Sequence, residues 1–292
     1  MSSFHGIWVA LVTPFNNAGA VDFPALRGLV DHLLAGDVAG LVVCGTTGEA
    51  AALSQAEQLA VLDAVLELAP PEKVVMGLAG NNQAELLQLQ REIVQRPIAG
   101  LLIPAPYYIR PSQDALVSFF HTLADASSVP VILYDIPYRT GVHLQLDTLR
   151  RIVAHERIVA IKDCGNNPEN TLAMLSEGQV DVLTGEDGQI FNALCLGASG
   201  VISAAAHLYP ERFVRLHRQV LAGQLEAARQ SFFQLLPLIQ TLFSEPNPAP
   251  VKTALAQQGL LCDALRAPMQ ASSAATATRL QALLQQLDGA PR

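Results

Sequence analysis

Lys162 is the residue of this sequence with the clearest capacity for chemistry, because it directly follows the apolar run Ile158-Val-Ala-Ile161. Burying an ammonium group costs several kcal/mol unless the group is paired or neutral. Desolvation lowers the pKa of a lysine, and the neutral amine attacks carbonyl carbon to form a Schiff base. Two interpretations of Lys162 follow: it is a nucleophile, or it is half of a structural salt bridge to Asp163 or Glu49.

Three other features carry side chains that suit an anionic carbonyl substrate. The segment Gly45-Thr-Thr-Gly-Glu49 offers two hydroxyl groups and exposed backbone N–H groups, which can bind a carboxylate; the alternative is an ordinary turn before a helix. Tyr134 ends an apolar run and is either a proton relay or a core tyrosine. Arg139 lies in a polar turn, where its guanidinium suits a second carboxylate or is simply solvated.

The candidate residues lie at or just after the ends of short apolar runs that alternate with helical patterns. Each run is continuous, as expected for parallel strands buried on both faces. Eight such units predict an α/β fold, a (β/α)8 TIM barrel, whose active site lies at the C-terminal ends of the strands. No G-x-G-x-x-G turn follows the first run, which argues against a doubly wound dinucleotide-binding sheet. The runs are Ile7–Val12, Gly40–Cys44, Lys73–Gly77, Gly100–Pro104, Val131–Tyr134, Ile158–Lys162, Val180–Thr184 and Gly200–Ser203.

The last part of the chain has a different pattern. From Pro210 onward the sequence shows helical patterns and no strand pattern. The first of these helices, over 211–222, closes the barrel, and the others form an appendage. We therefore predict a barrel catalytic domain over residues 1–224 and a C-terminal helical domain over residues 225–292.

Composition excludes several classes of protein. The chain has 292 residues, 18 Lys and Arg, and a net charge of -8. No basic stripe suits nucleic acid. The 4 cysteines and 7 histidines show no metal-ligand spacing, so we predict no metal site. The glycine-rich segment 197–200 precedes the last predicted strand, at the wrong end of the barrel for a phosphate site.

We also expect no association with membranes. No apolar run reaches the roughly 20 residues that a membrane-spanning helix needs. The first ten residues have no basic stretch before their apolar residues, so we expect no signal peptide. These features favour a cytoplasmic location.

Taken together, the motifs resemble those of the dihydrodipicolinate synthase family, within the pyruvate-dependent class I aldolase and lyase superfamily. The resemblance extends over essentially the whole chain, and it is specific because the motifs occur as an ordered set. The motif Arg139-Thr-Gly141 is the part that distinguishes this family from the sugar-acid lyases. The other matching segments are Ala10–Phe15, Gly45–Glu49, Pro106–Tyr108, Tyr134, Ile136-Pro137, Ile161–Asp163, Gly200–Ser203, Glu245–Pro248, Pro250–Lys252 and Leu265–Met269.

The resemblance implies that Lys162 forms an imine with pyruvate, without a further cofactor. The derived enamine would attack L-aspartate 4-semialdehyde, and cyclisation would give 4-hydroxy-tetrahydrodipicolinate, an intermediate of lysine and diaminopimelate biosynthesis. The resemblance also implies a proton relay of Tyr134, Thr47 and Tyr108, with Tyr108 supplied across a dimer interface. An imine cycle needs such a group that both gives and takes protons.

The resemblance further assigns the binding groups. Thr46 and Thr47 would hold the pyruvate carboxylate, Arg139 would bind the carboxylate of the second substrate, and the carbonyl of Ile202 would lie close to the imine. The expected assembly is a homotetramer of two tight dimers.

Some members of the family are inhibited by lysine bound at the dimer interface. The positions that match this cleft are Ala51, Asn81, Glu85 and Tyr107. The sensitive pattern carries a histidine at one or both of the positions that here are Gln55 and Gln58. Because a glutamine cannot become cationic, we expect weak or absent inhibition by lysine.

The chain also departs from the family pattern beside the expected site. Asp135 stands where asparagine is usual, and Tyr138 stands where a small polar residue is frequent. The imine chemistry does not depend on either position. These departures bear on the identity of the aldehyde substrate, because Tyr138 adjoins Arg139.

Three alternative functions remain at the level of sequence. The first is a related lyase that cleaves a 2-keto-3-deoxy sugar acid, or uses another aldehyde, through the same imine; Arg139 argues against it. The second is a catalytically silent small-molecule sensor on the same fold, which would require a missing nucleophile or relay. The third is a phosphate- or flavin-binding barrel, which the absence of a phosphate loop disfavours.

Overall fold

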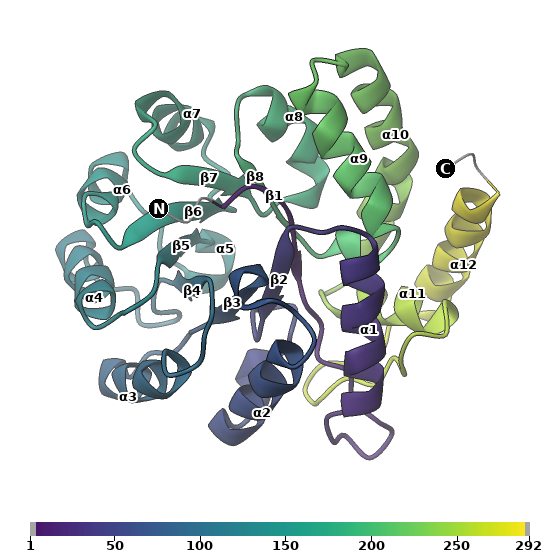
Figure 1. Cartoon of the computed structure of the whole chain (residues 1–292), viewed down its shortest axis with the longest axis horizontal. Coiled ribbons are helices and arrows are strands. Elements are labelled where there is room, and N and C mark those ends of the chain that lie inside the picture. Colours follow the sequence, from purple (N-terminus) through teal and green to yellow (C-terminus); the bar gives the residue numbers. More distant parts are fainter. Residues whose placement is uncertain (1–3, 290–292) are drawn as a thin grey trace.

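The computed structural model describes residues 4–289 and consists of a closed barrel of eight parallel strands surrounded by helices. Each strand pairs with the next one along the chain, and β8 pairs with β1 (Figure 1). The predicted TIM barrel is therefore confirmed, and each of the eight predicted runs overlaps one strand. The strands are β1 Gly6–Ala10, β2 Gly40–Val43, β3 Val74–Gly77, β4 Gly100–Pro104, β5 Val131–Asp135, β6 Ile158–Asp163, β7 Asp181–Thr184 and β8 Gly200–Ser203.

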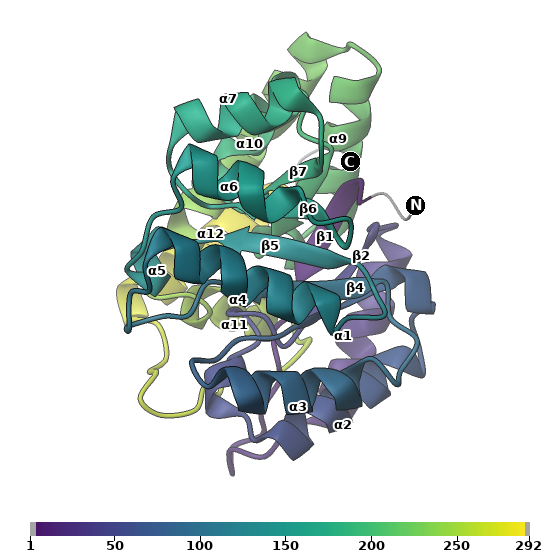
Figure 2. The ribbon, with the colours of Figure 1, turned by 90° about the vertical axis from the view of Figure 1, so that its left-hand side faces the viewer.

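Helices cover the outside of the strands and shield their outward-facing side chains from water. Figure 2 shows the successive helices α3, α4, α6 and α7 lying one above another along the outside of the barrel. Polar side chains start several of them: Ser54 and Glu57 form a reciprocal capping box at α2, and Ser112 caps α4. The barrel helices are α1 Phe23–Ala35, α2 Gln55–Leu66, α3 Gln83–Ile93, α4 Gln113–Asp125, α5 Pro137–Thr140, α6 Leu146–Val153, α7 Pro168–Glu177, α8 Ile190–Cys195 and α9 Pro210–Leu221.

Side chains alternate along each strand between two apolar clusters. In β5, Ile132 and Tyr134 belong to the cluster inside the barrel, whereas Val131 and Leu133 belong to the larger cluster between barrel and helices. Because the side-chain period of a strand is two, Lys162 in β6 points to the same side as Ala160, which lies in the inner cluster. The strand period thus directs the lysine into the barrel.

The C-terminal helices pack onto the barrel and onto one another. They are α10 Leu225–Leu242, α11 Ala249–Gln257 and α12 Ala274–Asp288. Helix α10 packs against α9 and α12, and α11 packs against α12. Their buried side chains, such as Leu235, Val251 and Leu280, join the same apolar cluster as the outer face of the strands. The division into domains at residues 224 and 225 stays a prediction.

Four short 3-10 helices complete the described part of the chain, and three of them follow barrel strands. They are η1 Ala50–Ala52, η2 Pro71–Lys73, η3 Asp187–Gln189 and η4 Ala205–His207. Within residues 4–289, no helix combines the length and apolar character needed to cross a membrane.

Candidate active site

A pocket lies at the C-terminal ends of the strands and contains most of the predicted site residues. Its volume is about 310 Å³, including the part open to solvent. Its wall is formed by six of the strands or by the segments that follow them, namely β1, β2, β5, β6, β7 and β8. Two residues of the C-terminal part complete the wall. The lining residues are Ala10, Thr46, Thr47, Tyr134, Tyr138, Arg139, Lys162, Gly185, Asp187, Ile202, Ala204, Phe243 and Asn247.

Lys162 and Tyr134 lie beside each other in this pocket. They are paired across β5 and β6, and the Lys162 Nζ atom is 4.3 Å from the centre of the Tyr134 ring. Both side chains are buried. Burial lowers the pKa of the Lys162 amine, although the charges of Asp187 and Glu186 act in the opposite direction. Burial therefore favours the neutral form of the Lys162 amine, which is the nucleophilic form.

The structure contradicts the interpretation of Lys162 as half of a salt bridge. Glu49, one suggested partner, forms its ion pair with Lys252 instead, at 2.5 Å. Asp163, the other suggested partner, accepts hydrogen bonds from the Thr171 hydroxyl and the Gly165 amide. Among the acidic side chains of residues 4–289, none forms an ion pair with Lys162.

Tyr134 is held in its protonated form. Burial raises the pKa of its phenol well above the usual value, while the Arg139 charge and a hydrogen bond with the Thr46 side chain act in the opposite direction. The phenol consequently stays neutral at physiological pH and can donate a hydrogen bond. A protonated phenol beside an amine whose pKa is lowered is a suitable pair for proton transfer.

The segment Gly45–Glu49 brings Thr46 and Thr47 to the pocket from the end of β2. Thr46 is exposed, whereas Thr47 is buried, and the Thr47 hydroxyl accepts a hydrogen bond from Asn247 Nδ2 at 2.9 Å. Because that lone pair is engaged, the Thr47 proton remains available to a ligand. This arrangement can bind a small carboxylate.

Arg139 lies in the short helix α5, directly after β5. It is exposed, and its guanidinium carbon is 5.4 Å from the centre of the Tyr138 ring, close enough for a cation–π contact. Both residues line the pocket. Arg139 therefore offers a positive charge at the pocket mouth, where Tyr138 restricts its position.

Two polar residues of the pocket, Asp187 and Asn247, have no role assigned from the sequence. Asp187, which starts η3 after β7, accepts hydrogen bonds from the Ser203 hydroxyl and from the amides of Ala204 and Ala205. It thereby fixes the turn after Ile202, whose side chain is buried in β8. The rule that places active sites after barrel strands is sufficient to find Asp187, because Gly185-Glu-Asp187 follows the seventh predicted run.

Asn247 is the second such residue, and its position is harder to predict. It lies between α10 and α11, 200 residues away in sequence from its partner Thr47. Two prolines flank it in Pro246-Asn-Pro248, which indicates a rigid turn. The sequence contains no signal for where that turn docks.

Some predicted residues lie outside this pocket. Tyr108 does not line it; the side chain is 89 % exposed, next to Tyr107 at 39 % and Ile109 at 55 %. Ala51, Asn81 and Glu85 are also exposed, in segments that follow β2 and β3. The roles suggested for these residues stay predictions.

Asp135 and Asp163 form a separate acidic pair behind the pocket. They are paired across β5 and β6, one residue beyond Tyr134 and Lys162, and they line a small cavity with Leu149 and Met174. Burial, with a smaller contribution from Asp163, raises the pKa of Asp135 to about 7. Strand alternation directs this pair to the helix side, away from the substrate side.

Comparisons with known proteins find similar chains over almost the whole length of this one. The model of the Dihydrodipicolinate synthetase family matches residues 3–287. A 4-hydroxy-tetrahydrodipicolinate synthase of Trichlorobacter lovleyi is 40% identical over 286 residues, which cover 97% of this chain and 98% of that relative. The synthase of Geobacter metallireducens is 38% identical over 288 residues, covering 98% and 99% of the two chains.

Solved structures match over a similarly large share of the chain. The dihydrodipicolinate synthase of Aquifex aeolicus has a TM-score of 0.94 and 33% identity, with 98% of each chain covered. The chloride-inhibited dihydrodipicolinate synthase of Acinetobacter baumannii, solved in complex with pyruvate, has a TM-score of 0.94 and 30% identity, with 98% of this chain and 99% of that chain covered.

Proposed function

The chain belongs to the Dihydrodipicolinate synthetase family, and we propose that it is a lyase that condenses pyruvate with L-aspartate 4-semialdehyde to give 4-hydroxy-tetrahydrodipicolinate. Relatives that carry the name 4-hydroxy-tetrahydrodipicolinate synthase match it over nearly their full length. The observation that carries the proposal is Lys162, a buried lysine without an ionic partner in the described chain, beside Tyr134 in the pocket. The product class places the enzyme in lysine and diaminopimelate biosynthesis.

The reaction begins at Lys162. Its neutral amine attacks C2 of pyruvate, and loss of the carbonyl oxygen as water gives a protonated imine. Removal of a proton from C3 gives an enamine, whose C3 forms a bond to the aldehyde carbon of the second substrate. The amino group of that substrate then displaces Lys162 from C2, which closes the ring and restores the free lysine. The cationic imine itself accepts the electron pair, so the proposal includes no cofactor.

Tyr134 and Thr47 are the groups proposed to move protons. The Tyr134 phenol is next to the amine, where it can protonate the departing oxygen and afterwards recover a proton. A hydrogen bond connects Tyr134 with the Thr46 side chain, and Thr47 is the next residue in the sequence. The polar side chains of Tyr134, Thr46 and Thr47 therefore extend from the Lys162 amine to the pocket wall.

The two carboxylates of the substrates need separate binding groups. We assign the pyruvate carboxylate to Thr46 and Thr47, because both line the pocket close to Lys162. We assign the carboxylate of the aldehyde substrate to Arg139, because a guanidinium forms strong bidentate hydrogen bonds with carboxylates. The Ile202 carbonyl, in the turn fixed by Asp187, is assigned a position next to the imine.

The proposal includes a cytoplasmic homotetramer of two dimers. Three consecutive exposed residues, Tyr107, Tyr108 and Ile109, form an apolar surface segment, and aromatic residues are enriched in interfaces. One solved relative is described as the first monomeric dihydrodipicolinate synthase variant, and light scattering measures the assembly of this chain. In the proposed dimer, Tyr108 completes the proton relay of the neighbouring subunit.

Borohydride trapping tests the proposed function. Reduction in the presence of pyruvate should add one reduced pyruvyl group to the protein, and peptide mapping should locate it on Lys162. Labelling of Lys73 or Lys252, or no labelling, contradicts the proposal. A coupled assay with pyruvate and a panel of aldehydes then identifies the second substrate; release of pyruvate from a 2-keto-3-deoxy sugar acid, without condensation, would identify the related lyase instead.

A further inference from the structure

The segment that carries Thr46 and Thr47 has an unusual backbone. Cys44 and Glu49, at its two ends, have positive φ angles of 52° and 54°, a conformation that costs non-glycine residues about 1–2 kcal/mol. Between them, Gly48 packs so closely that an added Cβ would lie 2.9 Å from the Leu11 carbonyl oxygen. The Thr13 hydroxyl donates a hydrogen bond to the Gly48 carbonyl at 2.7 Å. Surrounding contacts must therefore hold this segment in place.

A buried ion pair anchors the segment at Glu49, two residues after Thr47. The Lys252 Nζ atom is 2.5 Å from Glu49 Oε1, and the exposed fractions of the two side chains are 0% and 3%. Lys252 also donates a hydrogen bond to the Ala264 carbonyl at 2.9 Å and lies 4.1 Å from the centre of the Phe15 ring. The pair connects the end of β2 to helix α11.

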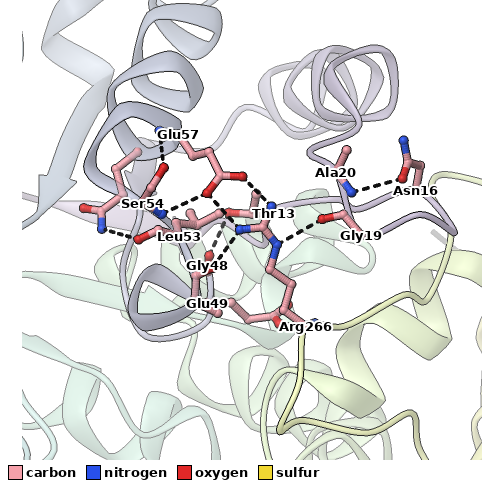
Figure 3. Close-up of polar contacts among 12 residues, drawn as sticks. Thr13, Asn16, Gly19, Ala20, Gly48, Glu49, Leu53, Ser54, Glu57 and Arg266 are labelled. Atoms are coloured by element: carbon pink, nitrogen blue, oxygen red, sulfur yellow. Dashed lines mark hydrogen bonds and ion pairs between the residues drawn. The ribbon is translucent and has the colours of Figure 1, made fainter.

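Arg266 forms a second set of contacts with Glu49 and the residues around it (Figure 3). Its backbone amide donates to Glu49 Oε2 at 3.1 Å, and its guanidinium donates to the carbonyls of Gly19 and Ala52 and to both carboxylate oxygens of Glu57. Glu57 in turn forms the capping box of α2 with Ser54. The Glu49 carboxylate is thus bonded from two points of the C-terminal part of the chain.

A stabilising role alone explains this arrangement poorly. Desolvating two charges often costs more than their attraction returns, and apolar replacements of buried ion pairs are often neutral or stabilising. The pair can instead hold the backbone near Glu49 in one place, because Glu49 and Lys252 are both held by further hydrogen bonds. The position that it determines is that of Thr46 and Thr47, which lie shortly before Glu49 in the chain and line the pocket.

We propose that Glu49 and Lys252 are positioning residues that set Thr46 and Thr47 for binding the pyruvate carboxylate. The proposal deepens the proposed function and rests on it. Neither side chain lines the pocket, so the pair acts through the threonines. Because Arg139 follows a different strand, the pair should affect pyruvate and leave the aldehyde substrate unaffected.

The test measures the two substrates separately in the full-length protein. The variant Glu49→Gln/Lys252→Met removes both charges at similar volume and leaves no unpaired buried charge. We expect the pyruvate concentration for half-maximal borohydride trapping to rise about tenfold, as for the loss of one well-aligned charged hydrogen bond. The Michaelis constant for the aldehyde should stay within about twofold of the wild-type value. Glu49→Asp keeps the charge but shortens the side chain, and should give a smaller rise for pyruvate alone.

The matched control is Asp63→Asn/Arg96→Met. This removes the ion pair between α2 and the loop after α3, where Arg96 Nε is 2.5 Å from Asp63 Oδ1, outside the pocket. It should leave both substrates unaffected.

Four outcomes separate the possibilities. Unchanged half-saturation by pyruvate in a folded Glu49→Gln/Lys252→Met variant overturns the positioning role. Equal rises for pyruvate and the aldehyde, with a lower melting temperature, also overturn it and indicate a purely structural pair. If the double variant does not fold, the Glu49→Asp variant tests the positioning role by the same two measurements, half-saturation by pyruvate and the Michaelis constant for the aldehyde. Failure of the wild-type protein to trap pyruvate contradicts the proposed function itself.

Discussion

Lys162 and Tyr134 occupy directly paired positions in neighbouring strands, and their side chains meet inside the barrel with 4.3 Å between the amine and the ring centre. Burial affects them in opposite directions, lowering the pKa of the amine and raising that of the phenol. Both effects favour the uncharged form. One physical cause therefore prepares a nucleophile and a proton donor side by side.

Replacement of Lys162 by arginine should abolish turnover and borohydride trapping. A guanidinium has a pKa above 12 and stays protonated, so it cannot attack C2 of pyruvate although the positive charge is kept. Mass spectrometry after reduction with pyruvate measures the loss. Circular dichroism checks the fold, and trapping retained in Lys162→Arg would place the imine on another residue.

Arg139→Ala should raise the Michaelis constant for the aldehyde while imine trapping by pyruvate remains intact. Loss of one hydrogen bond to a charged group costs roughly 1.5–3 kcal/mol, or about 10- to 150-fold. Steady-state kinetics with each substrate varied in turn measures the effect. The control is Arg151→Ala, which removes a surface ion pair to Asp114. If trapping fails as badly as turnover, Arg139 has a structural role instead.

Mixing two inactive variants tests whether Tyr108 acts on the neighbouring subunit. Lys162→Ala lacks the nucleophile and Tyr108→Phe lacks the relay hydroxyl. A mixed dimer would contain one site with its own Lys162 and an intact Tyr108 from its partner, so activity should return on mixing after dissociation and reassembly. No such site exists if Tyr108 acts within its own subunit. Light scattering that shows a fully active monomer would also reject the intersubunit role.

Asp135→Asn should stabilise the protein at alkaline pH. The pKa of Asp135 is raised from 3.8 to about 7, so the native state keeps a proton that the unfolded state has released. The resulting stability is complete below pH 3.8 and is lost as the pH rises through about 7. The amide cannot ionise, and the variant should gain a few kcal/mol over the wild type at pH 8 and little at pH 4.

Denaturant unfolding at several pH values measures this difference. The control is Asp147→Asn, because the Asp147 side chain is 79% exposed on α6. A gain for Asp135→Asn that is as large at pH 4 as at pH 8 would contradict the assigned titration.

Lysine should inhibit the enzyme weakly or not at all. The Gln58 side chain already donates hydrogen bonds to the carbonyls of Ala50 and Leu53, and neither it nor Gln55 can supply a positive charge. Losing one charge-assisted contact weakens binding by roughly 10- to 150-fold. A lysine titration of the initial rate measures the inhibition, and strong inhibition at submillimolar lysine would show that Asn81, Glu85 and Tyr107 suffice. Gln55→His/Gln58→His should increase sensitivity at pH 6.

The sequence by itself determined the barrel and the central pair of the site. Continuous apolar runs mark strands buried on both faces, and each of the eight runs overlaps a strand. Strand period and chain order then place Tyr134 and Lys162 at the same end of neighbouring strands. Both properties are local, so a single sequence reveals them.

Only the tertiary structure decided which charged and polar groups meet. Glu49 was a candidate partner of Lys162, but it pairs with Lys252, and Thr47 is bonded by Asn247 from 200 residues away. Lys252 lies in α11 and Asn247 lies in the turn before it, and the docking of this C-terminal part depends on the shape of the closed barrel. Spacing along the chain carries no information about such contacts, because they arise from the packing of complete surfaces and from the need to pair every buried charge.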